Sequence, residues 1–274
     1  MTESALVYMT RYLSIPVRTI GTTRVVAVRK YKSGDVWKTN YPKLVYADLR
    51  RFLKKEPPYA HHDHGYTGEW FSARDHPSQV IYMPEGRLHN CFNGKGTAEA
   101  FGKALQLIDY YLMKADLPLK TLGWSRAVTL QEFADYYLGL DCNGFVGSYF
   151  AASFPGSTIG PDTHCNDYDN AAHLGVKRMK LSEIRARDVL VREGAGGTRH
   201  VALIDSVTLG SSGDTVSILL VQSASSEGGL CAANKQLKWL KAPAAKKAET
   251  QSVISIDVLS GYEFNYAIGF PFVA

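Results

Sequence analysis

The stretch that decides the fold is residues 140–154, which reads LDCNGFVGSYFAASF. Its apolar residues recur at the spacing of one helical face. They are Phe145, Val146, Tyr149 and Phe150. Asp141 precedes this stripe at the position of a helix N-cap. The sequence therefore predicts a helix with Cys142 in its first turn.

Cys142 is placed where a cysteine can become a nucleophile. The positive end of the helix dipole and the unpaired N–H groups of the first turn favour the thiolate, which is the reactive form. The same N–H groups can stabilise an oxyanion on an attacked carbonyl. Gly144 and Gly147 each cost about 1 kcal/mol of helix propensity relative to alanine, which predicts a close approach by another segment or a substrate. The alternative is a small buried core cysteine.

A thiolate nucleophile needs a base, and His200 is the candidate. It begins an apolar, strand-like run at residues 200–207. The next run, residues 216–222, ends in Gln222, whose amide oxygen could accept a hydrogen bond from the imidazole ring. The alternatives are an exposed histidine at a strand end and a polar strand terminus at a sheet edge.

Four segments in this order resemble the NlpC/P60 cysteine peptidases, a papain-like family. DCNGFV at 141–146 is similar to the family's D-C-S-G-F-V signature. RDVLV at 187–191 resembles its G-D-L-V-F strand, and RHVALI at 199–204 resembles G-H-V-G-I-Y. VQSA at 221–224 stands where the family has its third polar residue. The resemblance covers about residues 130–230.

The resemblance implies that Cys142 is the nucleophile, His200 the general base and Gln222 the orienting residue. It also implies an α+β fold, in which the nucleophile begins a helix packed on an antiparallel β-sheet. Enzymes of this family cleave amide bonds in bacterial cell-wall peptides, commonly between D-glutamate and the diamino acid. The chain departs from the pattern at Asn143, where serine is usual. It also lacks the family's Tyr-x-Trp-Gly-Gly run before the cysteine.

The rest of the chain supports an α+β arrangement, because a helix is followed by a succession of strands rather than by βαβ units. The expected strands are 188–192, 200–207, 216–222 and 253–258, with a terminal one at 262–270. Helices are predicted at 97–113 and 129–138, the second with Thr129 and Glu132 in capping-box positions. We predict two domains: an unassigned N-terminal extension of mixed β, loop and helix at 1–125, and the catalytic core at 126–274.

Two histidine-containing segments invite a metal-site interpretation, namely His61-His62-Asp63-His64 and His164-Cys165-Asn166-Asp167. Adjacent loop residues rarely converge on one ion, so we predict neither a metal site nor a cofactor. Residues 56–96 are expected to be long loops with short strands. In the loop at 155–180, Asp162, Asp167 or Asp169 could line a substrate groove.

The chain has 274 residues, 45% of them hydrophobic, and a net charge of +5. The basic excess is N-terminal, because residues 1–60 hold 12 Lys and Arg against 4 Asp and Glu. This segment could bind an anionic wall or a delivery partner, or it could be a solvated face. We expect no nucleic-acid partner, no membrane span and no signal peptide.

The main hypothesis is a cysteine amidase or endopeptidase acting on peptidoglycan stem peptides. A wall hydrolase without a leader suggests an effector toxin exported by a dedicated secretion machinery, with an immunity protein that plugs the cleft. One alternative keeps the Cys–His pair but performs acyl transfer, deamidation or crosslinking on protein or lipid. The other is a non-enzymatic binding module with a structural cysteine.

Overall fold

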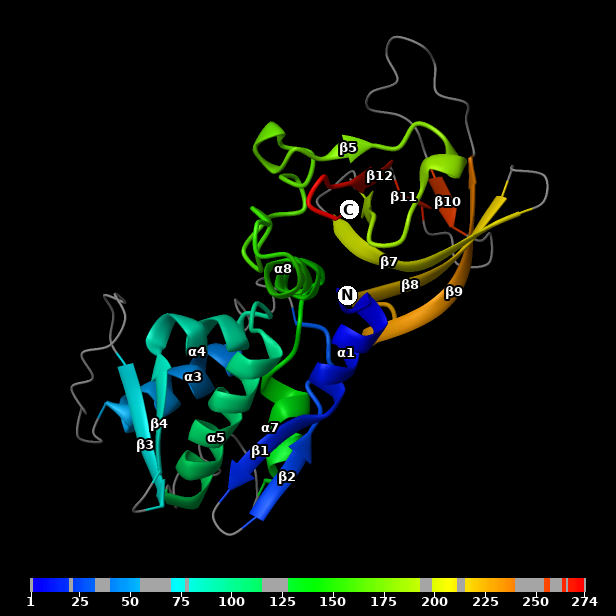
Figure 1. The fold of residues 1–274 in the computed structure, drawn as a ribbon. Coiled ribbons are helices and arrows are strands. Elements are labelled where there is room, and N and C mark those ends of the chain that lie inside the picture. Colours follow the sequence, from blue (N-terminus) through cyan, green and yellow to red (C-terminus); the bar gives the residue numbers. More distant parts are fainter. Residues whose placement is uncertain are drawn as a thin grey trace. The chain divides into compact units, whose positions relative to one another are not determined.

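The architecture is mixed α+β, as predicted at that level, with six α-helices and antiparallel sheets in the part of the chain described here. The structure is a computed structural model (Figure 1). It describes residues 2–19, 22–32, 40–54, 70–76, 79–114, 128–192, 199–210, 215–239, 254–256, 263–264 and 266–273. No helix in these ranges is both long enough and apolar enough to cross a bilayer.

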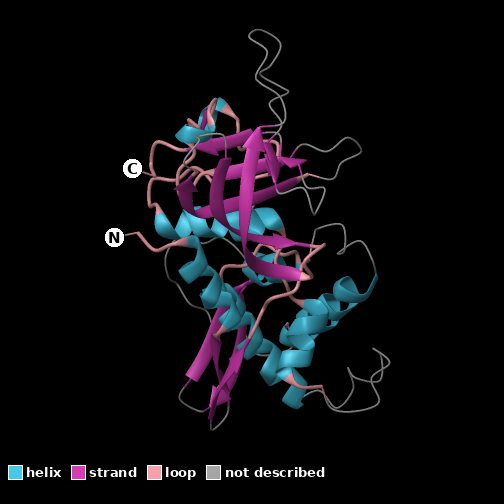
Figure 2. Cartoon of the chain, turned by 90° about the vertical axis from the view of Figure 1, so that its right-hand side faces the viewer, coloured by secondary structure: helices cyan, strands magenta, loops and turns pink. Residues whose placement is uncertain are grey.

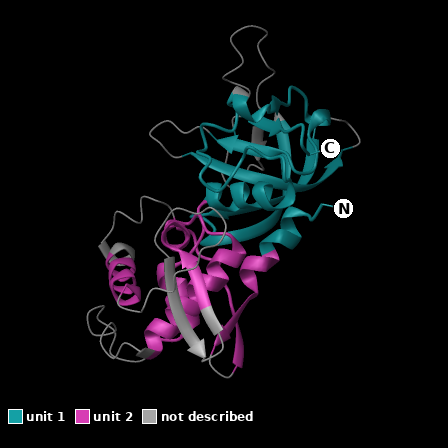
Figure 3. Cartoon of the chain, turned by 60° about the vertical axis from the view of Figure 1, so that its left-hand side comes forward, with its two compact units in different colours: residues 1–9, 142–274 teal, residues 10–141 magenta. Residues whose placement is uncertain are grey.

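The chain divides into two compact units (Figure 3). Unit 1 comprises Met1–Met9 and Cys142–Ala274, and unit 2 comprises Thr10–Asp141. Cys142, His200 and Gln222 all belong to unit 1. The predicted domains, 1–125 and 126–274, are parts of the chain that would fold independently, and this division remains a prediction.

Unit 1 contains an eight-stranded sheet, which is antiparallel at every pairing. The strand order is β11-β10-β9-β8-β7-β6-β12-β5. In chain order the strands are β5 Val176–Lys177, β6 Val189–Arg192, β7 His200–Leu209, β8 Thr215–Ala224, β9 Gly229–Trp239, β10 Ile254–Ile256, β11 Glu263–Phe264 and β12 Tyr266–Gly269. β11 also contacts β6, so the sheet curls.

β9 was not among the expected strands, although it is the longest strand described in the sheet. It pairs with β8 over all but its last residue, from Gly229 opposite Ala224 to Lys238 opposite Thr215. Its sequence, GLCAANKQLKW, has few of the β-branched and aromatic residues that mark a strand. Pairing with the apolar strand β8 overrides this weak local preference.

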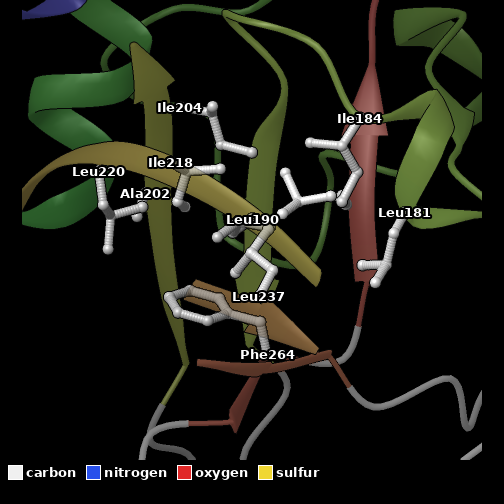
Figure 4. Packing of buried hydrophobic residues seen from close by; sticks show 11 residues of the cluster. Leu181, Ile184, Leu190, Ala202, Ile204, Ile218, Leu220, Leu237 and Phe264 are labelled. Atoms are coloured by element: carbon white, nitrogen blue, oxygen red, sulfur yellow. The ribbon is translucent and has the colours of Figure 1, made fainter. Parts of the chain in front are cut away.

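Helix α8, Cys142–Ser153, packs against β7 and β8 (Figures 1 and 2). Its first nine residues are all buried, which is why the helix is apolar around its circumference. A hydrophobic cluster fills the core of the sheet and includes Leu190, Ile204, Leu220, Leu237 and Phe264 (Figure 4). Two short 3₁₀ helices, Ala171–His173 and Leu181–Glu183, lie between α8 and β6 in the chain, and the second contributes Leu181 to this cluster.

The first residues of the chain pack within unit 1. Helix α1, Ala5–Leu13, begins there, and the ring of Tyr8 lies 5.5 Å from that of Tyr149 and 6.1 Å from that of Phe145. The backbone N–H of Leu6 donates to Asp205 Oδ1 at 2.8 Å. The N-terminal segment is therefore part of the core that supports α8.

Unit 2 holds two β-hairpins and most of the helices. The hairpins are β1 Ile15–Thr19 with β2 Thr22–Val26, and β3 Trp70–His76 with β4 Gln79–Pro84. The helices are α3 Asn40–Leu53, α4 Glu85–Phe92, α5 Ala98–Lys114 and α7 Leu130–Tyr137. The predicted capping box of α7 is confirmed, since Glu132 N–H donates to Thr129 Oγ1 and Thr129 N–H to Glu132 Oε2.

The expectation of loops and short strands at 56–96 was wrong for α4. Leu88, Cys91 and Phe92 are buried at helical spacing, so a single apolar stripe defines this helix. The stripe covers only about two turns and lies beside several Gly and Pro residues, so the sequence pattern did not predict the helix.

Candidate active site

His200 and Gln222 come from neighbouring strands and share one face of the sheet. Leu203 on β7 pairs directly with Val221 on β8. Because side chains alternate along a strand, His200 and Gln222 both lie on the face opposite to that pair. His200 Nε2 is 2.7 Å from Gln222 Oε1, a buried hydrogen bond. The amide oxygen can only accept, so Nε2 carries the hydrogen.

Cys142, the first residue of α8, forms a side-chain hydrogen bond with His200. Since Nε2 is engaged by Gln222, Nδ1 is the ring nitrogen left for the sulfur. The backbone N–H of Val201, next to the histidine on β7, also forms a hydrogen bond with the Cys142 sulfur. The structure thus brings together the three residues singled out in the sequence. The pair Cys142 and His200 is separated by 58 residues in the chain.

The electrostatics of this pair favour a thiolate and an imidazolium. The hydrogen bond between Cys165 and Cys142 has the largest effect on the pKa of Cys142. Together with the hydrogen bond and charge of His200 and the hydrogen bond of the Val201 N–H, it outweighs burial, which raises this pKa. The pKa of the Cys142 thiol is therefore held well below its usual value. Burial acts to lower the pKa of His200. The hydrogen bond and negative charge of Cys142, with the hydrogen bond to Gln222, outweigh burial and raise this pKa overall. Each group therefore stabilises the charged form of the other.

Cys165 is a member of the site that the sequence analysis did not assign. Its Sγ lies 3.8 Å from Cys142 Sγ and 2.9 Å from Asn143 Oδ1, so its single S–H donates either to Asn143 or to the Cys142 thiolate. Both cysteines are 4% exposed. The only sequence signal for Cys165 was its location in the loop between nucleophile and base.

The absence of a side chain at Gly147 lets the loop that carries Cys165 lie directly against α8. A Cβ at Gly147 would collide with the backbone of Gly160 and Pro161. The close approach expected from the helix glycines is therefore made by this loop at Gly147. The loop is fixed further along, where Gly160 N–H donates to Thr163 Oγ1 and Thr163 N–H to Gly160 O, each at 2.9 Å.

The strand before His200 is anchored by a buried ion pair. Asp188, 2% exposed, accepts hydrogen bonds from Arg178 Nε at 2.8 Å and Arg178 Nη2 at 2.7 Å. Its backbone carbonyl also accepts from Ile204 N–H on β7. At the other end of β6, Arg192 pairs directly with His200, and its positive charge acts to lower the pKa of the histidine.

In the described part of the chain, the side chains of Asp162, Asp167 and Asp169 form no hydrogen bond or ion pair with Cys142, His200 or Gln222. Asp162 and Asp167 are exposed, and Asp169 forms an ion pair with Lys177 at 3.1 Å. The His61–His64 segment lies outside the described residues. Across the described part of the chain, no group of three or more His, Cys, Asp and Glu residues is arranged to hold a metal ion.

Comparison of the chain with protein-family models, with curated proteins and with solved structures gives no significant match. The geometry of the site and the sequence motifs are therefore the grounds for its class.

Proposed function

We propose that this protein is a cysteine amidase or endopeptidase with a papain-like, NlpC/P60-type core, acting on amide bonds of peptidoglycan stem peptides. The observation that carries the proposal is the hydrogen-bonded series Cys142, His200 and Gln222. A nucleophile, a base and a group that orients the base are what nucleophilic amide hydrolysis requires. A structural cysteine would need neither the imidazole nor the lowered pKa.

In the proposed reaction the Cys142 thiolate attacks the amide carbonyl carbon, and the carbonyl oxygen becomes an oxyanion. Backbone N–H groups in the first turn of α8 are the nearest candidates to stabilise this charge. His200 then protonates the departing amine, which leaves an acyl group on the sulfur. Water, deprotonated by His200, attacks this thioester and releases the acid. Gln222 holds the ring in the tautomer that keeps Nδ1 facing the sulfur.

A backbone detail supports the family resemblance. Arg187 has a φ of 72°, in the left-handed region that glycine adopts most readily. It occupies the position of the glycine in the family's G-D-L-V-F motif. This chain adopts the left-handed conformation with arginine, whose Nη2 donates to the Thr2 carbonyl at 3.1 Å.

The test is digestion of purified peptidoglycan with the full chain, followed by mass analysis of the fragments. New amine and carboxyl termini within the stem peptide are expected. Cys142→Ala and His200→Ala should each lower kcat by about a thousandfold or more. Cys91→Ala is the matched control, because this buried thiol of unit 2 has a raised pKa and should be dispensable.

Two outcomes would redirect the proposal. Transfer of an acyl group to a second amine, without net hydrolysis, would favour the transferase or crosslinking alternative. A Cys142 thiol that does not react with iodoacetamide at pH 6 would favour the binding module with a structural cysteine. Export as an effector and an immunity partner stay predictions from the sequence.

A further inference from the structure

The second thiol beside Cys142 forms no covalent bond in the proposed hydrolysis and acts there only through the pKa of Cys142. Amide cleavage by a Cys–His pair uses one sulfur, whereas this site holds two at 3.8 Å. Cys165 lies on a loop that Gly147 allows to pass closely over α8. The Oδ1 atom of the neighbouring residue Asn143 lies 2.9 Å from the Cys165 sulfur, which keeps the Cys165 side chain directed towards the start of the helix.

From this geometry we propose that Cys142 and Cys165 form a reversible disulfide, which protects the nucleophile from irreversible oxidation by peroxides. The inference rests on the proposed function for its biological meaning, but not for its chemistry. A disulfide needs the two sulfurs at about 2.05 Å, so they must approach by roughly 1.8 Å. Rotation of the two side chains can supply such a movement.

The reaction balances with hydrogen peroxide as the oxidant. The Cys142 thiolate attacks one peroxide oxygen, the O–O bond breaks, and the hydroxide takes a proton from His200 and leaves as water. Cys142 is then a sulfenic acid. The Cys165 sulfur attacks the Cys142 sulfur, the S–O bond breaks, and the hydroxyl leaves with the Cys165 proton as a second water. Two thiols have lost two electrons and two protons to one peroxide.

The other two cysteines serve as contrasts. Burial raises the pKa of Cys91, which lies in unit 2, and of Cys231, which pairs with Gln222 across β8 and β9. Of these three thiols, only Cys142 has a lowered pKa. A thiol of low pKa is also a good leaving group, so a disulfide containing Cys142 should be reduced readily by dithiols.

The experiment treats the full chain with hydrogen peroxide and maps its peptides without reduction. In the wild type we expect a cross-linked pair of peptides containing Cys142 and Cys165, with the loss of two hydrogen atoms. Dithiothreitol should return nearly all of the Cys142 thiol. In Cys165→Ser, which keeps a hydrogen-bond donor for Asn143, Cys142 should gain two oxygen atoms as a sulfinic acid and recover little thiol. Cys231→Ser should behave like the wild type.

The inference is overturned if Cys142 of the wild type becomes sulfinic acid as fast as in Cys165→Ser, or if Cys142 crosslinks to Cys231 instead. Mapping in the wild type does not depend on how well any variant folds. It also needs no substrate, so a disulfide without wall cleavage would refute the proposed function alone. Wall cleavage without the disulfide would refute this inference alone.

Discussion

At the scale of single residues, the distinctive feature of the site is a neutral orienting group. Gln222 holds His200 through an amide oxygen at 2.7 Å and adds no negative charge. The imidazolium is therefore stabilised mainly by the Cys142 thiolate, which is itself stabilised by Cys165. The protonation states of cysteine and histidine depend on each other more than they would beside a carboxylate.

This mutual dependence predicts a bell-shaped pH profile for kcat/KM. The active form needs Cys142 deprotonated and His200 protonated. The rate should rise with pH through the lowered pKa of Cys142 and fall through the raised pKa of His200. Alkylation of Cys142 by iodoacetamide should follow the acid limb and persist well below the usual pKa of a thiol. In His200→Ala the alkylation midpoint should move to higher pH; an unchanged midpoint would contradict the ion pair.

Substitution of Gln222 separates orientation from reaction. Gln222→Ala should lower kcat by about ten- to a hundredfold, less than Cys142→Ala, because the ring loses its tautomer preference but keeps its nitrogen. Gln222→Glu should restore part of kcat and shift the alkaline limb to higher pH, since a carboxylate favours the imidazolium. The pH–rate profiles of the wild type, Gln222→Ala and Gln222→Glu test this prediction. Equal losses in Gln222→Ala and His200→Ala would require another orienting residue.

At the scale of elements, a loop and a helix are fitted to each other at Gly147. Ala is preferred over Gly in a helix interior by about 1 kcal/mol, so Gly147→Ala would be stabilising in an open helix. Here the added Cβ meets the backbone of Gly160 and Pro161. We expect a net destabilisation of about 1–3 kcal/mol from overpacking, and a higher alkylation pKa of Cys142 as Cys165 moves away.

Gly102 provides the matched control for this substitution. It lies in the interior of α5, where the nearest atom to an added Cβ is Ile15 Cγ2 at 3.4 Å. Gly102→Ala should therefore raise the free energy of unfolding by about 0.5–1 kcal/mol. Urea denaturation of both variants gives the comparison. Similar stabilisation in the two would mean that the loop does not pass so close to α8.

The sequence could predict those elements whose local pattern and tertiary role agree. The start of α8 at Cys142 and the strand that carries Gln222 fall in this class, because their segments are apolar in sequence and buried in the fold. β9 could not be predicted, since its place depends on pairing with β8 rather than on its own composition. Cys165 could not be placed either, because a loop's path over a helix is fixed by contacts such as that at Gly147.

At the scale of the whole molecule, the chain is not divided into consecutive units. Met1–Met9 belong to the same unit as Cys142–Ala274, although more than a hundred residues separate them in the sequence. Contacts of high sequence separation such as these are costly in chain entropy to form. The N-terminal segment contributes to the stability of the unit that holds the candidate site.

Tyr8 gives the test of this arrangement. Its side chain is 2% exposed and packs on Phe145 and Tyr149 of α8, so Tyr8→Ala should lower the free energy of unfolding of unit 1 by about 3–5 kcal/mol. Val7→Ala, at the neighbouring position of the same helix but 53% exposed, should change it by less than about 0.5 kcal/mol. Hydrogen exchange measured on peptides of β7 and β8 reports on unit 1 directly. If exchange there is unaffected by Tyr8→Ala, the N-terminal segment does not support the sheet that carries His200.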